Sequence, residues 1–252
     1  MLWFMAKRFD QYCPVAHAMS LVGERWAMLV VRELLKGPRR YTDLAAGLPG
    51  IGTNILATRL RELEAAGVVH KRRLPPPAAS TVYELTEYGA GLEEVVHAMA
   101  RWGARSLGPP CADDVFDHEW GLDAFPALLY PERARGLTET YVIAVDDDVF
   151  TVALEDGRLR AELGAVEDPD LAAAMDFATF FELASGDLPP QDALDDGRVR
   201  IEGDPASLTR FFDIFSFASR VAEPAPPRDD ERLAPRVRPP AAAAGPTLIR
   251  SA

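Results

Sequence analysis

Basic side chains are concentrated in two short segments of the first half of the sequence. Lys71, Arg72 and Arg73 are consecutive in a segment with the composition of a β-strand, and Arg39 and Arg40 precede a short helical pattern. Cations grouped in this way can bind the phosphates of a nucleic acid. We predict DNA contacts for all five residues. A solvated surface is the alternative for both segments, and for Arg39 and Arg40 the two interpretations are equally compatible with the sequence.

A second set of polar side chains lies on the helix expected at residues 53–66. Asn pairs well with adenine and Arg with guanine, and the positive N-terminal end of a helix suits a phosphate. The alternative for Arg61 is an ion pair with Glu62 or Glu64 of a neighbour. The residues predicted to contact bases or backbone from this helix are Thr53, Asn54, Thr58, Arg59 and Arg61.

These residues require a fold that places a helix beside a basic hairpin. Helical patterns separated by turn signals are expected at residues 14–22, 25–36, 42–46 and 53–66. Strands are expected at residues 68–74 and 81–86, with a proline-rich loop between them. In the last helix Leu56, Leu60 and Leu63 recur at helical spacing and should face inward. This order of elements is that of a winged helix-turn-helix domain, which reads a DNA groove and holds its phosphates.

A long helix expected at residues 88–107 has an apolar stripe too long for a small winged helix to cover. The stripe consists of Leu92, Val95, Val96, Met99 and Trp102. A second copy of the chain would cover it, so we predict a homodimer. Two-fold symmetry then predicts inverted DNA half-sites about 34–36 Å apart.

Charge divides the chain into two modules. Residues 1–110 contain 14 Lys and Arg against 10 Asp and Glu, whereas residues 111–252 contain 13 against 29. The net charge of −12 therefore does not exclude a DNA-binding first module. We predict domains at residues 10–107 and 119–220. The Pro- and Ala-rich segment 221–252 is predicted to be a disordered tail.

The second module has the pattern of an α+β domain. Strands are expected at residues 140–145, 149–154, 158–163 and 198–202, with a hairpin turn at Asp156-Gly157. Helices are expected at residues 119–129, from Asp168-Pro169 to about residue 184, and from Asp204-Pro205 to about residue 218.

Residues 13–107 resemble the HxlR-type winged-helix regulators, which are relatives of the MarR group. The blocks that carry the resemblance are Cys13-Pro14-Val15, Glu24-Arg25-Trp26, Arg32-Glu33-Leu34, residues 37–44, residues 60–67, residues 83–86 and Arg101-Trp102-Gly103. The resemblance implies a dimeric bacterial transcription factor, for which repression is the more common outcome.

Residues 120–217 resemble, less specifically, the sterol-carrier-protein-like fold. Residues 177–186 and 195–204 carry this resemblance. It implies a domain that holds a small apolar or aromatic ligand between its sheet and helices. Most aromatic residues of this region should be core, and those predicted to line a ligand site are Trp120, Met175, Phe181, Phe212 and Phe215.

Other sites are predicted less strongly by the sequence. Cys13 begins a helix, where a thiolate is stabilised, and the equivalent cysteine senses oxidants in some relatives, but a small packing residue is the favoured interpretation. Cys13 and His17 alone make a poor metal site. The acidic residues between 113 and 119 are interpreted as a linker rather than a metal site, and no cofactor is expected. No apolar run is long enough to span a membrane, and a cytoplasmic location is the default.

These observations together predict a dimeric DNA-binding regulator whose affinity for an operator depends on a ligand in the second domain. A lipid carrier with a vestigial winged helix is one alternative, although the basic hairpin argues against it. An enzyme is the less favoured alternative, because the four histidines are scattered and no nucleophile elbow, phosphate-binding glycine loop or zinc-protease motif is present.

Overall fold

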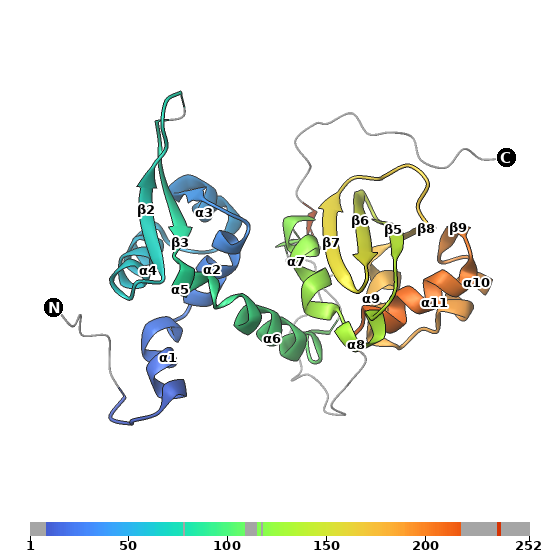
Figure 1. Ribbon diagram of the computed structural model, residues 1–252, viewed down its shortest axis with the longest axis horizontal. Coiled ribbons are helices and arrows are strands. Elements are labelled where there is room, and N and C mark those ends of the chain that lie inside the picture. The colour runs from blue at the N-terminus through green and yellow to red at the C-terminus, as the bar shows by residue number, and fades with distance from the viewer. Residues whose placement is uncertain (1–8, 78, 109–114, 117, 218–235, 238–252) are drawn as a thin grey trace. The chain divides into compact units, whose positions relative to one another are not determined.

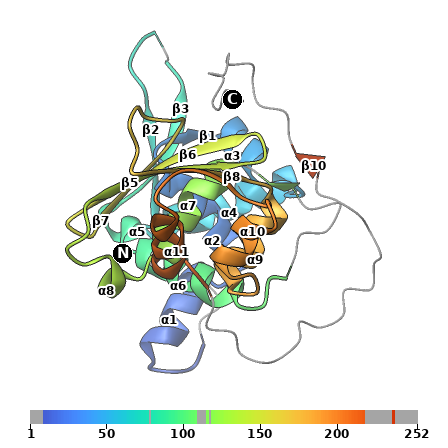
Figure 2. The same ribbon diagram turned by 90° about the vertical axis from the view of Figure 1, so that its right-hand side faces the viewer.

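The computed structural model describes residues 9–77, 79–108, 115–116, 118–217 and 236–237. The chain divides into two compact units, residues 1–99 and 100–252. Figure 1 labels most elements of both units, and Figure 2 also labels β1 and β10. The predicted tail lies outside the described residues except for the two residues of strand β10, Arg236–Val237, and so do Cys111 and most of the acidic linker.

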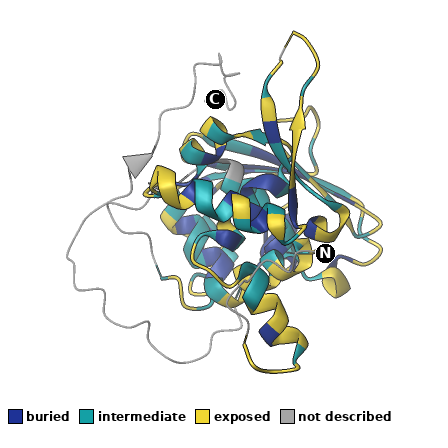
Figure 3. Ribbon diagram, turned by 90° about the vertical axis from the view of Figure 1, so that its left-hand side faces the viewer, coloured by how far each residue is buried: buried dark blue, intermediate teal, exposed yellow. Residues whose placement is uncertain are grey.

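The first unit is a winged helix-turn-helix, as predicted. Its helices are α1 (Pro14–Val22), α2 (Ala27–Leu35), α3 (Tyr41–Gly47), α4 (Thr53–Ala65), α5 (Glu87–Ala90) and α6 (Glu93–Ala104), the last of which continues into the second unit. Its strands are β1 (Arg39–Arg40), β2 (Val69–Arg73) and β3 (Thr81–Leu85), which form an antiparallel sheet in the order β1-β3-β2. Strand β2 is exposed after Val69, whereas β3 has one exposed, one buried and three half-buried residues (Figure 3).

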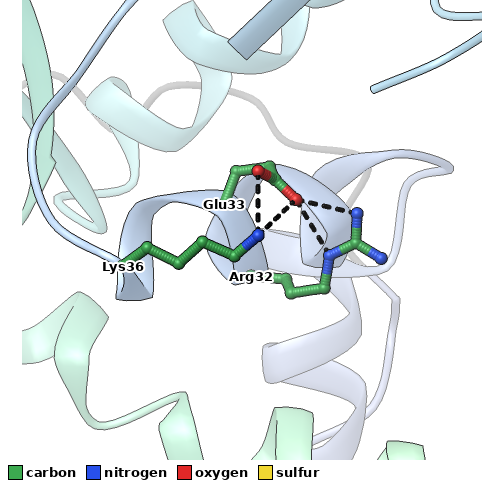
Figure 4. A network of polar contacts seen from close by, with 3 residues as sticks. All are labelled: Arg32, Glu33 and Lys36. Carbon is green, nitrogen blue, oxygen red and sulfur yellow. Dashed lines mark hydrogen bonds and ion pairs between the residues drawn. The ribbon is translucent and has the colours of Figure 1, made fainter. Parts of the chain in front are cut away.

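A buried carboxylate of α2 lies close to the end of α3. Glu33 of α2 is 3% exposed, and its carboxylate accepts bonds from Arg32 at 2.8 and 3.1 Å and from Lys36 at 3.4 and 3.5 Å (Figure 4). These cations offset the cost of burying the charge. A β-carbon added to Gly47 would lie 2.7 Å from the same carboxylate, so the end of α3 packs closely on α2.

The prediction of one continuous helix at residues 88–107 is wrong. The chain forms the short helix α5, passes through Gly91 and Leu92, and then begins α6. Thr86 caps α5 by accepting a bond from the Gly89 N–H at 3.0 Å. Two glycines within four residues weaken a continuous helix, and Gly89 packs against the backbone of Val68, which fixes the turn.

The second unit is a five-stranded sheet with helices on one face (Figure 2). Its strands are β5 (Glu139–Val145), β6 (Asp148–Glu155), β7 (Arg158–Leu163), β8 (Leu171–Met175) and β9 (Arg200–Gly203), in the order β7-β6-β5-β8-β9. Its helices are α7 (His118–Leu128), α8 (Pro131–Ala134), α9 (Phe177–Ser185), α10 (Pro190–Asp195) and α11 (Pro205–Ile214), and a short strand β4 (Val115–Phe116) pairs with β10. The predicted α+β class is confirmed.

The prediction of a helix from Asp168-Pro169 to about residue 184 is wrong for the first half of that range. Residues 171–175 form β8, which pairs parallel with β5 and antiparallel with β9. The following helix, α9, is capped instead by Asp176, which accepts a bond from the Thr179 N–H at 2.7 Å. The alanine-rich sequence of β8 favours a helix locally, but burial of its alternate residues on the sheet outweighs that propensity.

The core of the second unit is aromatic and lies on one face of the sheet. Phe211 of α11 is fully buried, and its ring lies 5.1 Å from those of Tyr141 and Phe212 and 4.9 Å from that of Phe215. The predicted turn at Asp156-Gly157 has φ angles of 51° and 77°, as a tight hairpin requires. No helix within the described ranges has the length and apolar character needed to cross a lipid bilayer.

Candidate nucleic-acid interface

The N-terminal end of α4 presents polar side chains. Thr53 and Asn54 are exposed there, and the preceding residue, Gly52, has no side chain to occupy the free N–H groups of the first turn. The Tyr41 hydroxyl donates a bond to the Thr53 carbonyl at 2.7 Å, so α3 holds the first turn of α4 in place. The predicted inward stripe is confirmed, because its leucines are at most 1% exposed.

Arg61 lies back along α4 toward its N-terminus. Its guanidinium donates bonds to the Thr58 hydroxyl at 3.1 Å and to the Ala57 carbonyl at 3.3 Å. This conformation groups the cation with the exposed N-terminal turns of the helix. Helical spacing places Asn54, Thr58 and Arg61 on one side of α4, and Thr53 lies at the first position of the helix.

Arg59 is held differently from these residues. Its side chain is only 16% exposed, and its guanidinium is bonded to Glu62 and lies 3.6 Å from the carboxylate of Glu24. Arg59 thus connects α4 to the segment before α2. These ion pairs hold Arg59 within the domain, and its predicted contact with the DNA backbone stays a prediction.

The register of the hairpin places neighbouring cations of β2 on opposite faces. Lys71 is paired with Tyr83 and Arg73 with Thr81, whereas Arg72 is paired with Val82. Successive side chains of a strand alternate in direction, so Lys71 and Arg73 share one face and Arg72 occupies the other. Arg73 is exposed near the tip of the hairpin.

Lys71 bridges the hairpin and α4. Its ammonium donates a bond to the carboxylate of Glu64 at 2.7 Å and lies 5.5 Å from the centre of the Tyr83 ring. The bond to Glu64 raises the pKa of Lys71 above its usual value. Lys71 is therefore both a surface cation and a packing residue.

Arg72 forms a two-pronged ion pair with Glu84 on the opposite face. Its Nε and Nη2 atoms donate to the two carboxylate oxygens, each at 2.7 Å. The Nε2 atom of His70 lies 2.8 Å from the same carboxylate. Hydrogen bonding from Arg72 lowers the pKa of Glu84, and the same bond raises the pKa of Arg72.

Arg39 and Arg40 lie at the opposite edge of the same sheet from β2. They form β1, which pairs with β3 opposite Tyr83 and Val82. The backbone N–H of Arg40 donates to the carboxylate of Asp43 at 3.0 Å and so begins α3. The sheet therefore brings the two basic segments of the sequence to either side of β3, a pairing that the sequence does not reveal.

Two carboxylates of this surface, Glu64 and Glu84, are absent from the residues predicted from sequence. Both are paired with predicted DNA-binding cations. The register of β2 with β3 identifies Glu84 as a partner of Arg72, and the packing of α4 near β2 identifies Glu64 as a partner of Lys71. Neither follows from sequence spacing alone.

The residues predicted to line a ligand site lie in or beside the aromatic core of the second unit. Met175, Phe212 and Phe215 are 7%, 5% and 1% exposed, whereas Trp120 is half-buried. Phe181 is also half-buried and packs on Phe217, with 5.3 Å between ring centres. These contacts are those of core residues, and a ligand-binding role for them stays a prediction.

Cys13 immediately precedes α1 and is half-buried with a free thiol. No group of three or more His, Cys, Asp or Glu side chains in the described part of the chain is arranged to hold a metal ion.

Comparisons with known proteins identify both units. Residues 21–110 match the HxlR-like helix-turn-helix family, and residues 123–216 match the SCP-2 sterol transfer family. The chain is 35% identical over 108 residues to the HTH-type transcriptional regulator YodB of Bacillus subtilis, covering 42% of this chain and 95% of YodB. It is 38% identical over 92 residues to the HTH-type transcriptional regulator sll1512 of Synechocystis, covering 36% and 68% of the two chains.

Among solved structures, the reduced form of YodB from B. subtilis is 35% identical to this chain. The match covers 99% of the YodB chain and 40% of this chain, with a TM-score of 0.35. The redox regulator HypR in its oxidised form is 33% identical and 94% covered, with 36% of this chain and a TM-score of 0.34. The family assignment depends on the sequence matches. The chain belongs to the HxlR family of helix-turn-helix transcriptional regulators, and its helix-turn-helix is followed by a domain of the SCP-2 sterol transfer family.

Proposed function

We propose that the protein is a dimeric repressor that binds an inverted-repeat operator and releases it in response to a small apolar ligand. One observation carries the DNA-binding part of this proposal. In a chain of the HxlR family, α4 carries exposed Thr53, Asn54 and Arg61 and half-buried Thr58, in the same unit as a hairpin that carries Lys71, Arg72 and Arg73. Such a pair of elements reads bases from the helix and holds phosphates from the hairpin.

Replacing Arg72 with alanine is expected to weaken binding to duplex DNA from the chain's own promoter. The loss of one phosphate contact should lower the affinity roughly 10-fold at low salt. It should also reduce the slope of log affinity against log salt by about one unit for each hairpin that contacts the duplex. Fluorescence anisotropy at two salt concentrations measures both quantities.

Arg160→Ala is the matched control, because Arg160 is an exposed arginine on a strand of the second unit. It should bind like the unchanged protein. Equal binding by the unchanged protein and Arg72→Ala would exclude a phosphate contact at Arg72. Weak binding that does not distinguish the promoter duplex from unrelated DNA would favour the lipid-carrier or enzyme alternative over a regulator.

The proposed dimer would use apolar side chains that the rest of the described chain leaves uncovered. On α6 these are Val95, Met99 and Trp102, which are 44%, 52% and 74% exposed and recur at helical spacing. Tyr12, just before α1, and Val15, in its first turn, are 106% and 70% exposed. Patches of this kind are commonly covered by a partner, and a two-fold axis would bury each residue twice.

Trp102→Asp is expected to convert the dimer into a monomer. Burial of a large apolar side chain contributes about 1.5–3 kcal/mol, and symmetry doubles the loss, so the dissociation constant should rise at least about 100-fold. Light scattering after size-exclusion chromatography measures the mass. Leu163→Asp, at a 46% exposed position of β7, is the control and should leave the mass unchanged. A wild-type protein that is monomeric at all concentrations would contradict the proposed dimer.

The ligand part of the proposal is supported by the match of residues 123–216 to the SCP-2 family and by the aromatic composition of the core. A coupling of about 1–3 kcal/mol between ligand and operator would change operator affinity roughly 5- to 150-fold. Native mass spectrometry of the purified protein would identify material that copurifies with it. A molecule that binds tightly and leaves operator affinity unchanged would mean that the second domain is a carrier.

A further inference from the structure

In the protein without DNA, Arg72, which faces away from α4, is already ion-paired with Glu84. Both prongs of the Arg72 guanidinium are bonded to Glu84 at 2.7 Å, and the side chain of Arg72 is nevertheless 45% exposed. The side chain of Glu84 is less exposed than that of Arg72, at 18%. The Nε2 atom of His70 also lies 2.8 Å from its carboxylate. The Glu84 carboxylate thus accepts the two bonds from Arg72 that the oxygens of a phosphate group could also accept.

A phosphate can take the place of this carboxylate only by competing with it. An exposed arginine without a counter-ion would gain the full attraction of a phosphate, whereas Arg72 must first lose its two bonds to Glu84. The hydrogen bond from Arg72 lowers the pKa of Glu84, which favours the charged carboxylate that competes with a phosphate. Glu84 therefore reduces the gain from each phosphate contact that Arg72 makes.

Lys71 is in a different situation, although it too is paired with a carboxylate. Its contacts with Glu64 and Tyr83 join β2 to α4, so changes at Glu64 would alter packing as well as charge. The Arg72–Glu84 ion pair lies within the hairpin. Glu84 is directly opposite His70 in the strand register, and Arg72, two residues after His70, is its diagonal neighbour on the same face. Neutralising Glu84 therefore changes the charge while leaving the hairpin's backbone pairing in place.

We propose that Glu84 is an affinity-determining residue of the DNA-binding surface, an internal counter-ion that holds Arg72 until a DNA phosphate displaces it. The inference rests on the proposed DNA-binding function and adds a residue that limits it. Because phosphates carry no base information, Glu84 lowers affinity for every duplex by the same factor and leaves the ratio between operator and unrelated DNA unchanged. A regulator limited in this way is more easily released from DNA.

The test compares Glu84→Gln with the unchanged full-length protein. Binding is measured by anisotropy with a duplex from the chain's own promoter and with a shuffled duplex, each at two salt concentrations. We expect Glu84→Gln to bind both duplexes about 2- to 5-fold more tightly for each hairpin in contact. This factor corresponds to the energy of one exposed ion pair, which the variant no longer has to break. The salt slope should stay close to that of the unchanged protein, because Arg72 contacts the same phosphate in both proteins and only the cost of freeing it differs.

Two further variants show whether the gain acts through Arg72. In Arg72→Ala protein, adding Glu84→Gln should produce no gain, because the cation that it releases is absent. Glu93→Gln makes the same change in net charge on α6, on the side of the helix opposite Trp102, and should leave affinity within error of the unchanged protein. Glu84→Thr, a neutral residue that suits a strand, provides a second test if Glu84→Gln folds poorly.

The outcomes separate this inference from the proposed function. Tighter binding that requires Arg72 and is equal on both duplexes supports it. An unchanged or lower affinity of Glu84→Gln and Glu84→Thr, a gain that persists without Arg72, or an equal gain from Glu93→Gln would overturn it while leaving DNA binding intact. If the unchanged protein binds neither duplex at low salt, the proposed function and this inference both fail.

Discussion

Phe211→Ala should unfold the second unit well before the unchanged protein unfolds. Phe211 is fully buried, and its ring touches the rings of Tyr141, Phe212 and Phe215 at centre distances of 4.9–5.1 Å, with Phe125 at 6.3 Å. Removal of a buried phenylalanine side chain costs about 3–5 kcal/mol, because apolar contacts are lost and a cavity remains. A small domain has only about 5–15 kcal/mol of stability in total. The expected result is a transition midpoint lowered by at least about 10 °C.

Calorimetry of the full chain measures this effect, since it resolves transitions of separate units. Phe181→Ala is the control of matched size. Phe181 is half-buried and packs on Phe217 at the edge of the core, so its loss should be clearly smaller. Equal shifts for the two variants would show that Phe211 is not at the centre of the core. The shift should be confined to the transition of the second unit.

Gly89→Ala should destabilise the first unit and detach the base of the hairpin. A β-carbon at this position would lie 2.0 Å from the Val68 carbonyl oxygen and 3.0 Å from its carbon, and both atoms belong to the backbone. Backbone atoms cannot rotate away as a flexible side chain can, so the cost should lie at or above the upper end of overpacking, about 3 kcal/mol. Val68 precedes β2, and its carbonyl also accepts the Thr86 N–H at 3.0 Å. Displacement of Val68 should therefore move the hairpin and weaken DNA binding.

Urea denaturation followed by circular dichroism, together with anisotropy on promoter DNA, measures both consequences. Gly103→Ala is the control, because a β-carbon there meets nothing within 4 Å and the residue lies inside α6. Alanine should stabilise that helix by up to about 1 kcal/mol. A Gly89→Ala protein as stable as the unchanged protein would mean that α5 does not hold the hairpin.

Local sequence patterns specified most of the helices and hairpins. Leu56, Leu60 and Leu63 identified the buried side of α4, and Asp204-Pro205 marked the start of α11, where Asp204 accepts the Ala206 N–H at 2.9 Å. The turn at Asp156-Gly157 was equally specific. These features depend on periodicity, caps and turns within a few residues, which a sequence displays directly.

The misassigned segments are those in which distant residues outweighed local propensity. The alanine-rich residues 171–175 became a strand because β5 and β9 offered partners on both sides, and the helix predicted at 88–107 was interrupted where Gly89 packs on Val68. The two-residue strand β1 exists only through its pairing with β3. Interactions of this kind have no signature in the segment itself.

The sequence by itself determined which residues could contact DNA: the basic segments, the polar side of α4 and the order of helix and hairpin. Only the tertiary structure decided how those residues are held. Strand alternation sent Lys71 and Arg72 to opposite faces, Arg59 is ion-paired with Glu24 and Glu62, and the register of β2 with β3 brought Glu84 to Arg72. The physical reason is range: helical and turn propensities act over a few residues, whereas the pairing of charges depends on which distant segments lie side by side.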